Sequence, residues 1–103
     1  MIKVSVMYPA GDGKTFDMDY YCGKHIPMVK EKLGAACKNV AVEGGIGGGE
    51  PGSKPIYIGM GHLYFDSVEA FQMAFGPHAK AILADIPNYT NIQPVMQISE
   101  VKM

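Results

Sequence analysis

The chain has 103 residues, which suffices for one modest hydrophobic core and excludes two, so we predict a single domain over residues 1–103. Its formal charge is −1 and all nine basic residues are lysine, which offers neither a basic surface nor an arginine fork for phosphate groups. Nucleic acid is therefore not an expected partner. No apolar run reaches the length of a signal peptide or a membrane span, so we expect a cytoplasmic protein that does not enter a membrane.

The first elements read as a strand and then a helix. Residues 2–8 alternate around Val4 and Val6 and end at a turn rich in glycine, which predicts a strand. A helix is expected to begin near Asp17, a suitable N-cap, and to end at Gly34, where the apolar period stops.

This first helix carries a histidine, His25, on its apolar face. The residues expected on the same face are Met18, Tyr21, Cys22, Val29, Lys32 and Leu33. Because Tyr21 and His25 are four residues apart, their phenol and imidazole rings should lie side by side. An imidazole in apolar surroundings can accept a proton near neutral pH, and a phenol can donate to a developing oxyanion. The pair is a candidate for proton transfer; the alternative is a buried histidine bonded to a backbone carbonyl.

The remaining elements complete a recognisable order. A short strand is expected over 38–43, a glycine- and proline-rich loop over 44–55, and the clearest strand over 56–65. Asp66 and Glu69 indicate a capping box at the start of a second helix that ends near Asp85. A last strand is expected over 92–101. The order βαββαβ predicts an α+β, ferredoxin-like fold with both helices on one face of a four-stranded antiparallel sheet.

The strand over 56–65 is apolar on both faces. Ile56, Ile58, Met60 and Tyr64 point one way, whereas Tyr57, Leu63 and Phe65 point the other. A sheet face left bare by the helices would then be too apolar for a stable monomer, so we predict a homodimer.

Further residues are candidates for a ligand pocket between helices and sheet. On the second helix, His78 and Phe75 are expected near the inward face, and Met28 on the first helix adds an apolar contact. On the strand, His62 and Tyr64 share one face and are candidates for the pocket floor, although a role in packing or at the dimer interface is an alternative for His62.

Neither metals nor disulfides are expected. The separations between the three histidines are not local zinc-ligand spacings, and no cysteine or carboxylate is grouped with them. Cys22 and Cys37 form no CxxC motif, so both are expected to be reduced thiols.

Several segments resemble the EthD family across nearly the whole chain. They are the start at 1–8, the residues Phe16, Tyr20, Tyr21, Lys24, His25, Ile26 and Pro27, and the late run 85–90. The resemblance implies the dimeric α/β-barrel superfamily, in which two sheets pair into a barrel with the helices outside. The family takes its name from ether degradation, and the superfamily includes cofactor-free isomerases, cyclases, lyases, decarboxylases and monooxygenases, together with haem-linked members.

The residues and the resemblance together lead to three functional hypotheses. The first is a cofactor-independent catabolic enzyme in which His25 moves a proton of a small apolar or aromatic carbonyl compound, while Tyr21 or His78 stabilises the oxyanion. The second is a dimeric carrier without chemistry of its own that serves a partner oxygenase. The third, a haem protein, would need His62 or His78 as an axial ligand.

Overall fold

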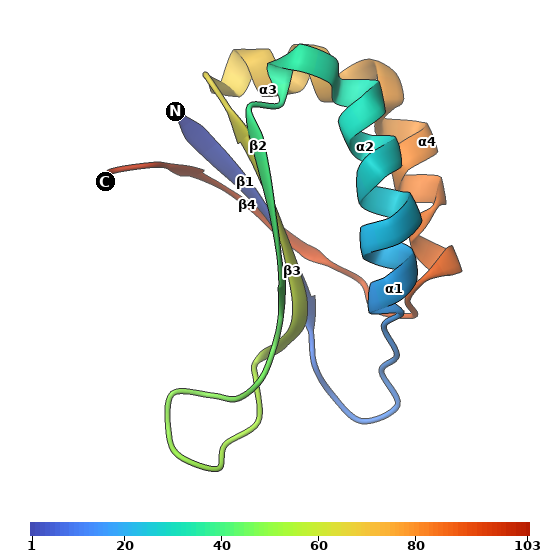
Figure 1. The fold of residues 1–103 in the computed structure, drawn as a ribbon, viewed down its shortest axis with the longest axis vertical. Helices are drawn as coiled ribbons and strands as arrows, with labels where there is room; N and C mark the ends of the chain where they lie inside the picture. The colour runs from blue at the N-terminus through green and yellow to red at the C-terminus, as the bar shows by residue number, and fades with distance from the viewer.

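The computed structural model describes all 103 residues and has the expected α+β, ferredoxin-like topology. Four antiparallel strands lie in the order β2-β3-β1-β4, and both helical segments cover one face of the sheet (Figure 1). The strands are β1 (Ile2–Pro9), β2 (Asn39–Gly44), β3 (Tyr57–Phe65) and β4 (Val95–Glu100). No helix has both the length and the apolar character needed to cross a membrane.

The first helical segment begins and ends where the sequence predicts. The Asp17 side chain accepts a hydrogen bond from the Tyr20 amide at 3.0 Å, and Gly34 ends the segment with a φ of 63°. Between these ends the helix changes character. It comprises α1 (Met18–Tyr20), a π-helical turn (Tyr21–His25) and α2 (Ile26–Leu33).

The π-helical turn rotates the buried face away from the face expected of a regular helix. The Ile26 amide donates to the Tyr21 carbonyl five residues back, so the turn contains one residue more than an α-helical turn. Ile26 is therefore buried, whereas Cys22 and Lys32, expected to point inward, are exposed. Pro27 is the second residue after this turn and has no amide hydrogen to donate to the helix, which favours a widened turn before it.

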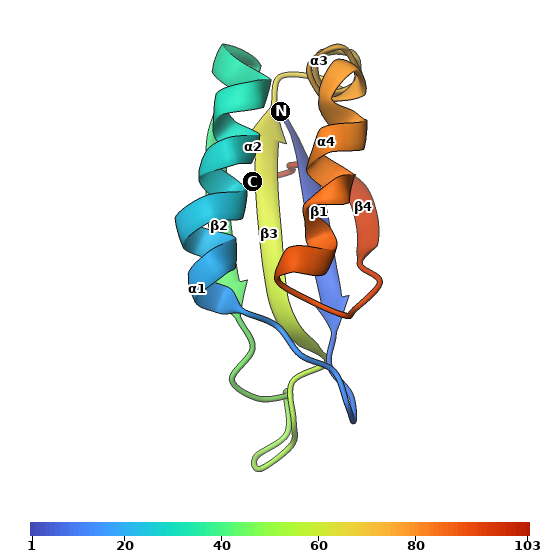
Figure 2. The ribbon, with the colours of Figure 1, turned by 90° about the vertical axis from the view of Figure 1, so that its right-hand side faces the viewer.

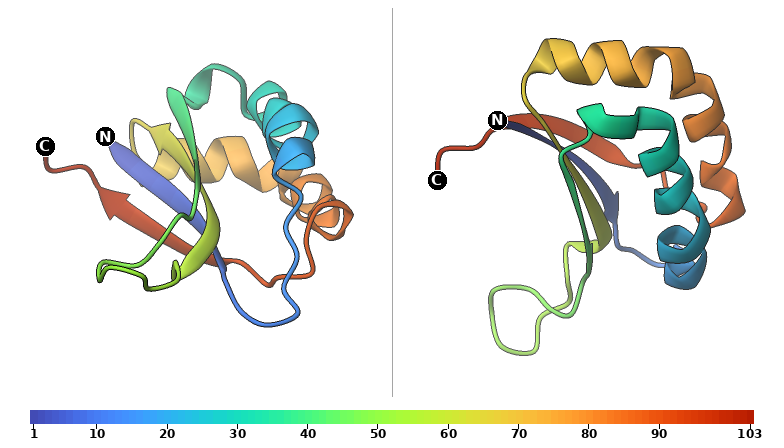
Figure 3. Two further views of the ribbon diagram at one scale, coloured as in Figure 1. Left: turned by 60° about the horizontal axis from the view of Figure 1, so that its bottom comes forward. Right: turned by 45° about the horizontal axis from the view of Figure 1, so that its top comes forward.

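The second helical segment is bent. It comprises α3 (Val68–Phe75), a 3-10 turn (Gly76–His78) and α4 (Ala79–Ala84), followed by another 3-10 turn (Ile86–Asn88), and Figure 3 shows the change of direction. Its N-cap is Ser67, which accepts from the Ala70 amide at 3.0 Å, and not Asp66 as the sequence suggested. Ser67 takes this role because its backbone is extended and it stands three residues before Ala70, whose amide its hydroxyl caps.

The hydrophobic core lies between the helices and the sheet. Its main cluster consists of Ile2, Val4, Val29, Leu33, Leu63, Phe65, Phe71 and Ile82. The last strand is shorter than expected: Ile92 is buried but lies in a loop, and β4 begins only after Pro94, which cannot donate to a ladder.

The helices and strands meet at one end of the molecule through the loops before α1 and after α4 (Figure 2). The Asp17 amide donates to the Tyr89 carbonyl at 2.7 Å, and the Thr90 hydroxyl donates to the Thr15 carbonyl at 2.6 Å. These bonds hold the segment around Tyr89 beside the start of the first helix, although the two are more than seventy residues apart in sequence.

Candidate functional site

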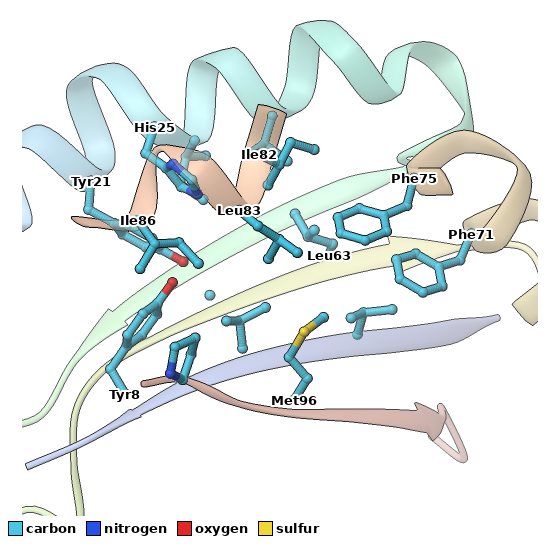
Figure 4. Close-up of a pocket in the computed structure, with 16 residues that line it drawn as sticks. Tyr8, Tyr21, His25, Leu63, Phe71, Phe75, Ile82, Leu83, Ile86 and Met96 are labelled. Carbon is cyan, nitrogen blue, oxygen red and sulfur yellow. The ribbon is translucent and has the colours of Figure 1, made fainter. Parts of the chain in front are cut away.

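A narrow cavity of ≈ 50 Å³ lies between the helices and the sheet. Thirteen of its sixteen lining residues are hydrophobic, so the cavity suits an apolar ligand. Tyr8, Tyr21 and His25 supply polar groups at one end, and Phe71 and Phe75 line the other end (Figure 4).

The rim of the cavity lies between α4 and β4. Leu83 and Ile86 from the helical side and Pro94 and Met96 from the strand side line both the cavity and the groove that adjoins it. Leu83 is 48% exposed and Met96 is 46% exposed, so this rim is the open side of the cavity.

Tyr21 lies against the sheet at a glycine. A Cβ atom at Gly61 would stand 2.1 Å from the Tyr21 hydroxyl oxygen, so any larger residue at that position would displace the phenol. The Tyr21 hydroxyl points toward that of Tyr8 across the polar end of the cavity (Figure 4). The absence of a side chain at Gly61 thus determines where the Tyr21 hydroxyl, a hydrogen-bond donor, lies.

His25 is paired with a carboxylate. Its Nδ1 lies 2.8 Å from Oδ2 of Asp85, and the histidine side chain is almost fully buried. Oδ1 of Asp85 accepts from the Tyr20 hydroxyl at 2.8 Å and from the Asn88 amide at 2.9 Å. Burial disfavours the charged carboxylate, but the hydrogen bonds from Asn88, His25 and Tyr20 outweigh it and hold the pKa of Asp85 below its usual value.

An ionised Asp85 determines which imidazole nitrogen is available. A carboxylate accepts the proton on Nδ1, so the neutral imidazole of His25 presents Nε2 as its basic nitrogen. Nε2 lies 3.4 Å from the Tyr89 hydroxyl, which in turn lies 2.7 Å from the Tyr8 hydroxyl. A chain of hydrogen-bonding groups thus leads from Asp85 through His25 and Tyr89 to Tyr8 at the cavity wall.

The phenols of this site are proton donors, not phenolates. Burial raises the pKa of Tyr8, Tyr21 and Tyr89 far above neutrality. A neutral phenol can donate a hydrogen bond to a carbonyl or an enolate oxygen. The site therefore combines a base oriented by a carboxylate with neutral donors, the combination that proton transfer next to a carbonyl requires.

The cavity brings together three of the residues selected from sequence. Tyr21, His25 and Phe75 line it. His78 lies at the bend between α3 and α4, half-buried, and does not line the cavity, because the 3-10 turn directs α3 and α4 differently. Met28 packs against the main core cluster and does not reach the cavity either.

The expectation that His62 and Tyr64 form the pocket floor is wrong, because both lie on the opposite face of the sheet. Strand alternation places Gly61 and Leu63 toward the helices and these two residues away from them. His62 is buried there, with Nδ1 at 2.9 Å from the Ser5 hydroxyl and Nε2 at 3.2 Å from a Glu43 carboxylate oxygen.

No three histidine, cysteine or acidic side chains are grouped as a metal site would need. Cys22 and Cys37 form no disulfide in the structure.

Sequence reasoning missed three members of the site, namely Asp85, Tyr89 and Tyr8. Tyr8 and the run from Asp85 to Tyr89 both occur in the segments that resemble the EthD family, but no local pattern assigned them a role. They join His25 only through contacts between segments far apart in the sequence. The sequence signal that could have revealed them is a carboxylate and an aromatic residue just after the second helical segment. In this fold that loop lies beside the start of the first helical segment.

Comparisons with known proteins agree on the family. The family model described as the EthD domain matches residues 13–93. An EthD-like protein from Ralstonia eutropha JMP134 is 49% identical, with 99% of this chain and 92% of that chain covered and a TM-score of 0.95. A comparison with curated proteins finds no match.

Two more distant structures share the fold. An ethyl tert-butyl ether d (EthD) family protein from Bacillus halodurans C-125 is 21% identical, with 99% of each chain covered and a TM-score of 0.74. A dimeric ferredoxin-like protein of unknown function from Thermobifida fusca YX is 19% identical, with coverage of 97% and 90% and a TM-score of 0.53. Because the family model spans most of the chain and the Ralstonia protein is nearly half identical along it, the chain belongs to the EthD family.

Proposed function

We propose that this EthD-family chain binds a small apolar carbonyl compound between its helices and its sheet, and that His25 moves a proton on that compound without a cofactor. The observation that carries the proposal is the buried pairing of His25 with Asp85 at the polar end of an otherwise apolar cavity. A basic nitrogen, an orienting carboxylate and neutral donors within one cavity are a constellation typical of general acid–base catalysis.

The proposed reaction begins with a proton on the carbon next to the carbonyl group. Nε2 of His25 gives up its 3.4 Å contact with the Tyr89 hydroxyl and accepts this proton, and the electron pair of the broken C–H bond moves into the enolate, whose negative charge lies on the carbonyl oxygen. Asp85 stabilises the imidazolium that forms, because its carboxylate accepts from Nδ1 at 2.8 Å. The Tyr21 hydroxyl donates a hydrogen bond to the enolate oxygen. Return of the proton to another carbon would be isomerisation, and other fates would be lyase or cyclase reactions.

The same cavity supports a second candidate, a carrier without chemistry. Tyr8, Tyr89 and His25 already bond to one another at 2.7 and 3.4 Å, so an apolar ligand can occupy the cavity without taking part in any proton transfer. Under this candidate the ligand would be delivered unchanged to a partner enzyme such as an oxygenase.

We also propose that the protein is a homodimer. The sheet face opposite the helices carries Met7, Met60, Tyr64 and Val95, and no helix or strand covers it (Figure 1). The Thermobifida fusca protein with this fold is described as dimeric. Pairing of two such faces would give the barrel expected from the family resemblance.

Native mass spectrometry with a panel of aromatic, lactone and β-keto compounds separates the two candidates. Wild type is compared with His25→Ala and with His78→Ala, a control at a histidine outside the cavity. For an enzyme, we expect a compound to be converted by wild type and by His78→Ala but to be left intact by His25→Ala.

The other outcomes are equally informative. A compound that all three proteins bind and return unchanged would favour the carrier. Conversion that persists in His25→Ala would contradict the proposed base, and the absence of any bound compound would contradict the proposed ligand site.

A further inference from the structure

We infer that the cavity selects a neutral ligand with a single oxygen-bearing head group and rejects anions, and that Tyr21 and Asp85 determine this selectivity. The inference rests on the proposed function, because it presumes that the cavity is a ligand site. It adds the chemical class of the ligand: a methyl ketone, aldehyde or ester with a compact apolar tail, as opposed to a carboxylate or a phosphorylated compound.

The charge of the site excludes anions. With neutral His25 and ionised Asp85 the pair carries a charge of −1, and with protonated His25 it carries zero. No lysine lines the cavity, and the chain contains no arginine. While Asp85 is ionised the site is therefore not net positive, and an anionic ligand would be buried in an apolar cavity without a counter-ion, which weakens its binding or forces protonation of the ligand.

The donors at the polar end fit a neutral oxygen. Burial keeps the pKa of Tyr8 and Tyr21 far above neutrality, so both hydroxyls carry protons. The two hydroxyls point toward each other at the end of the cavity (Figure 4), where a carbonyl oxygen could accept from Tyr21, whereas the Tyr8 proton is directed to Tyr89. His25 stands beside them, because its ring stacks on that of Tyr21 with centroids 5.5 Å apart.

The opposite end fixes the orientation of the ligand. Phe71 and Phe75 stack at a centroid distance of 5.3 Å and, together with Ile82, provide only apolar surface. A ligand with its oxygen at the tyrosines must therefore place its tail against the phenylalanines. The volume of ≈ 50 Å³ is well below the roughly 150 Å³ of a protein cavity that holds one benzene ring, so a tail of one ring enters only when the exposed Leu83 and Met96 at the rim move.

Three probes of nearly equal size test the inference: acetophenone, benzoate and ethylbenzene. They share a phenyl ring and differ in carrying a neutral carbonyl, a carboxylate or no oxygen. Dissociation constants are measured by NMR titration at constant ionic strength and neutral pH. We expect acetophenone to bind at least about tenfold more tightly than benzoate. We expect acetophenone to bind about three- to tenfold more tightly than ethylbenzene, because its carbonyl oxygen gains one hydrogen bond.

Two variants assign the selectivity to residues. Tyr21→Phe keeps the ring and removes the hydroxyl, so acetophenone should lose its advantage over ethylbenzene. Asp85→Asn removes the negative charge, so the gap between acetophenone and benzoate should narrow. Tyr57→Phe, at a tyrosine that does not line the cavity, is the matched control and should leave all three constants unchanged.

The outcomes distinguish this inference from the proposed function. Equal binding of benzoate and acetophenone would overturn the charge selectivity while leaving the ligand site in place. Equal binding of acetophenone and ethylbenzene, or an undiminished preference in Tyr21→Phe, would overturn the role of the tyrosine. Binding of none of the three would overturn the ligand site and the inference together.

Discussion

Asp85 is the residue that orients the candidate base, and its contribution can be measured through pH. Its pKa is lower in the folded protein than in an unfolded chain, so the folded state holds the carboxylate more strongly charged. The stabilisation is therefore fully present above the unfolded pKa of about 3.9 and is lost as the pH falls through the lower folded value.

We expect Asp85→Asn to lower the free energy of unfolding at neutral pH by about 1–2 kcal/mol, because the carboxylate that accepts from His25, Tyr20 and Asn88 is lost. Denaturant titrations from neutral to acidic pH check this. The difference between wild type and variant should stay constant above about pH 4 and shrink below it. A difference that grows on acidification would contradict the ionised state of Asp85.

Gly61 offers a second test at the scale of single residues. Gly61→Ala should destabilise the protein by about 1–3 kcal/mol, because the new methyl group would overlap the Tyr21 hydroxyl at 2.1 Å. Combining it with Tyr21→Phe should recover much of that loss, since the next nearest atoms of the ring lie at 3.3 and 3.7 Å. Thermal or chemical unfolding of the two single variants and the double variant gives the coupling.

Gly23→Ala is the control, because nothing lies within 4 Å of the added carbon and the residue lies in a helical segment. It should be neutral or slightly stabilising. If Gly61→Ala were as harmless as Gly23→Ala, the close contact between Tyr21 and the sheet would be absent in solution.

The elements themselves show which parts of the fold follow from local sequence. The ends of the first helical segment are predictable, because Asp17 and Gly34 act through their own backbone and nearest turn. Its buried face is not predictable from a regular helical wheel, because the π-helical turn at Tyr21–His25 shifts every later residue. The predictions for Cys22 and Lys32 are wrong for this reason, whereas Tyr21, His25, Val29 and Leu33 are buried as predicted.

The start of the second helical segment gives a prediction at this scale. Ser67→Ala should destabilise the protein by about 1 kcal/mol, because the Ala70 amide loses its partner. Asp66→Ala should change stability by less than about 0.5 kcal/mol, because Asp66 caps no amide and its ion pair with Lys38 is exposed. Equilibrium unfolding of both variants checks the assignment, and the reverse order of effects would contradict it.

At the scale of the whole molecule, the topology follows from the order of patterned segments, but the site does not. His25 meets Asp85 and Tyr89 across about sixty residues of sequence, and the contacts depend on how the loops before α1 and after α4 converge. His62 was misassigned because period-two alternation groups residues by face without saying which face the helices cover. Long-range geometry, unlike capping or periodicity, leaves no local signature.

The proposed dimer makes a prediction about the uncovered sheet face. Light scattering should give a mass of about 22 kDa, twice that of the 11.1 kDa chain. Met60→Glu should shift the protein toward the monomer, because Met60 lies on the bare face in register with Met7. Met73→Glu, at a methionine 78% exposed on α3, is the matched control and should leave the mass unchanged. A wild-type monomer at micromolar concentration would contradict the dimer.

The central claim, that His25 abstracts a proton next to a carbonyl group, is tested most directly by deuterium incorporation. The protein is incubated in D₂O with acetophenone or another ketone that it binds, and NMR follows exchange at the carbon beside the carbonyl. We expect exchange faster than the buffer rate with wild type and with His78→Gln, and at the buffer rate with His25→Gln. Exchange by His25→Gln at the wild-type rate, or no exchange by wild type with any ketone that it binds, would contradict the claim.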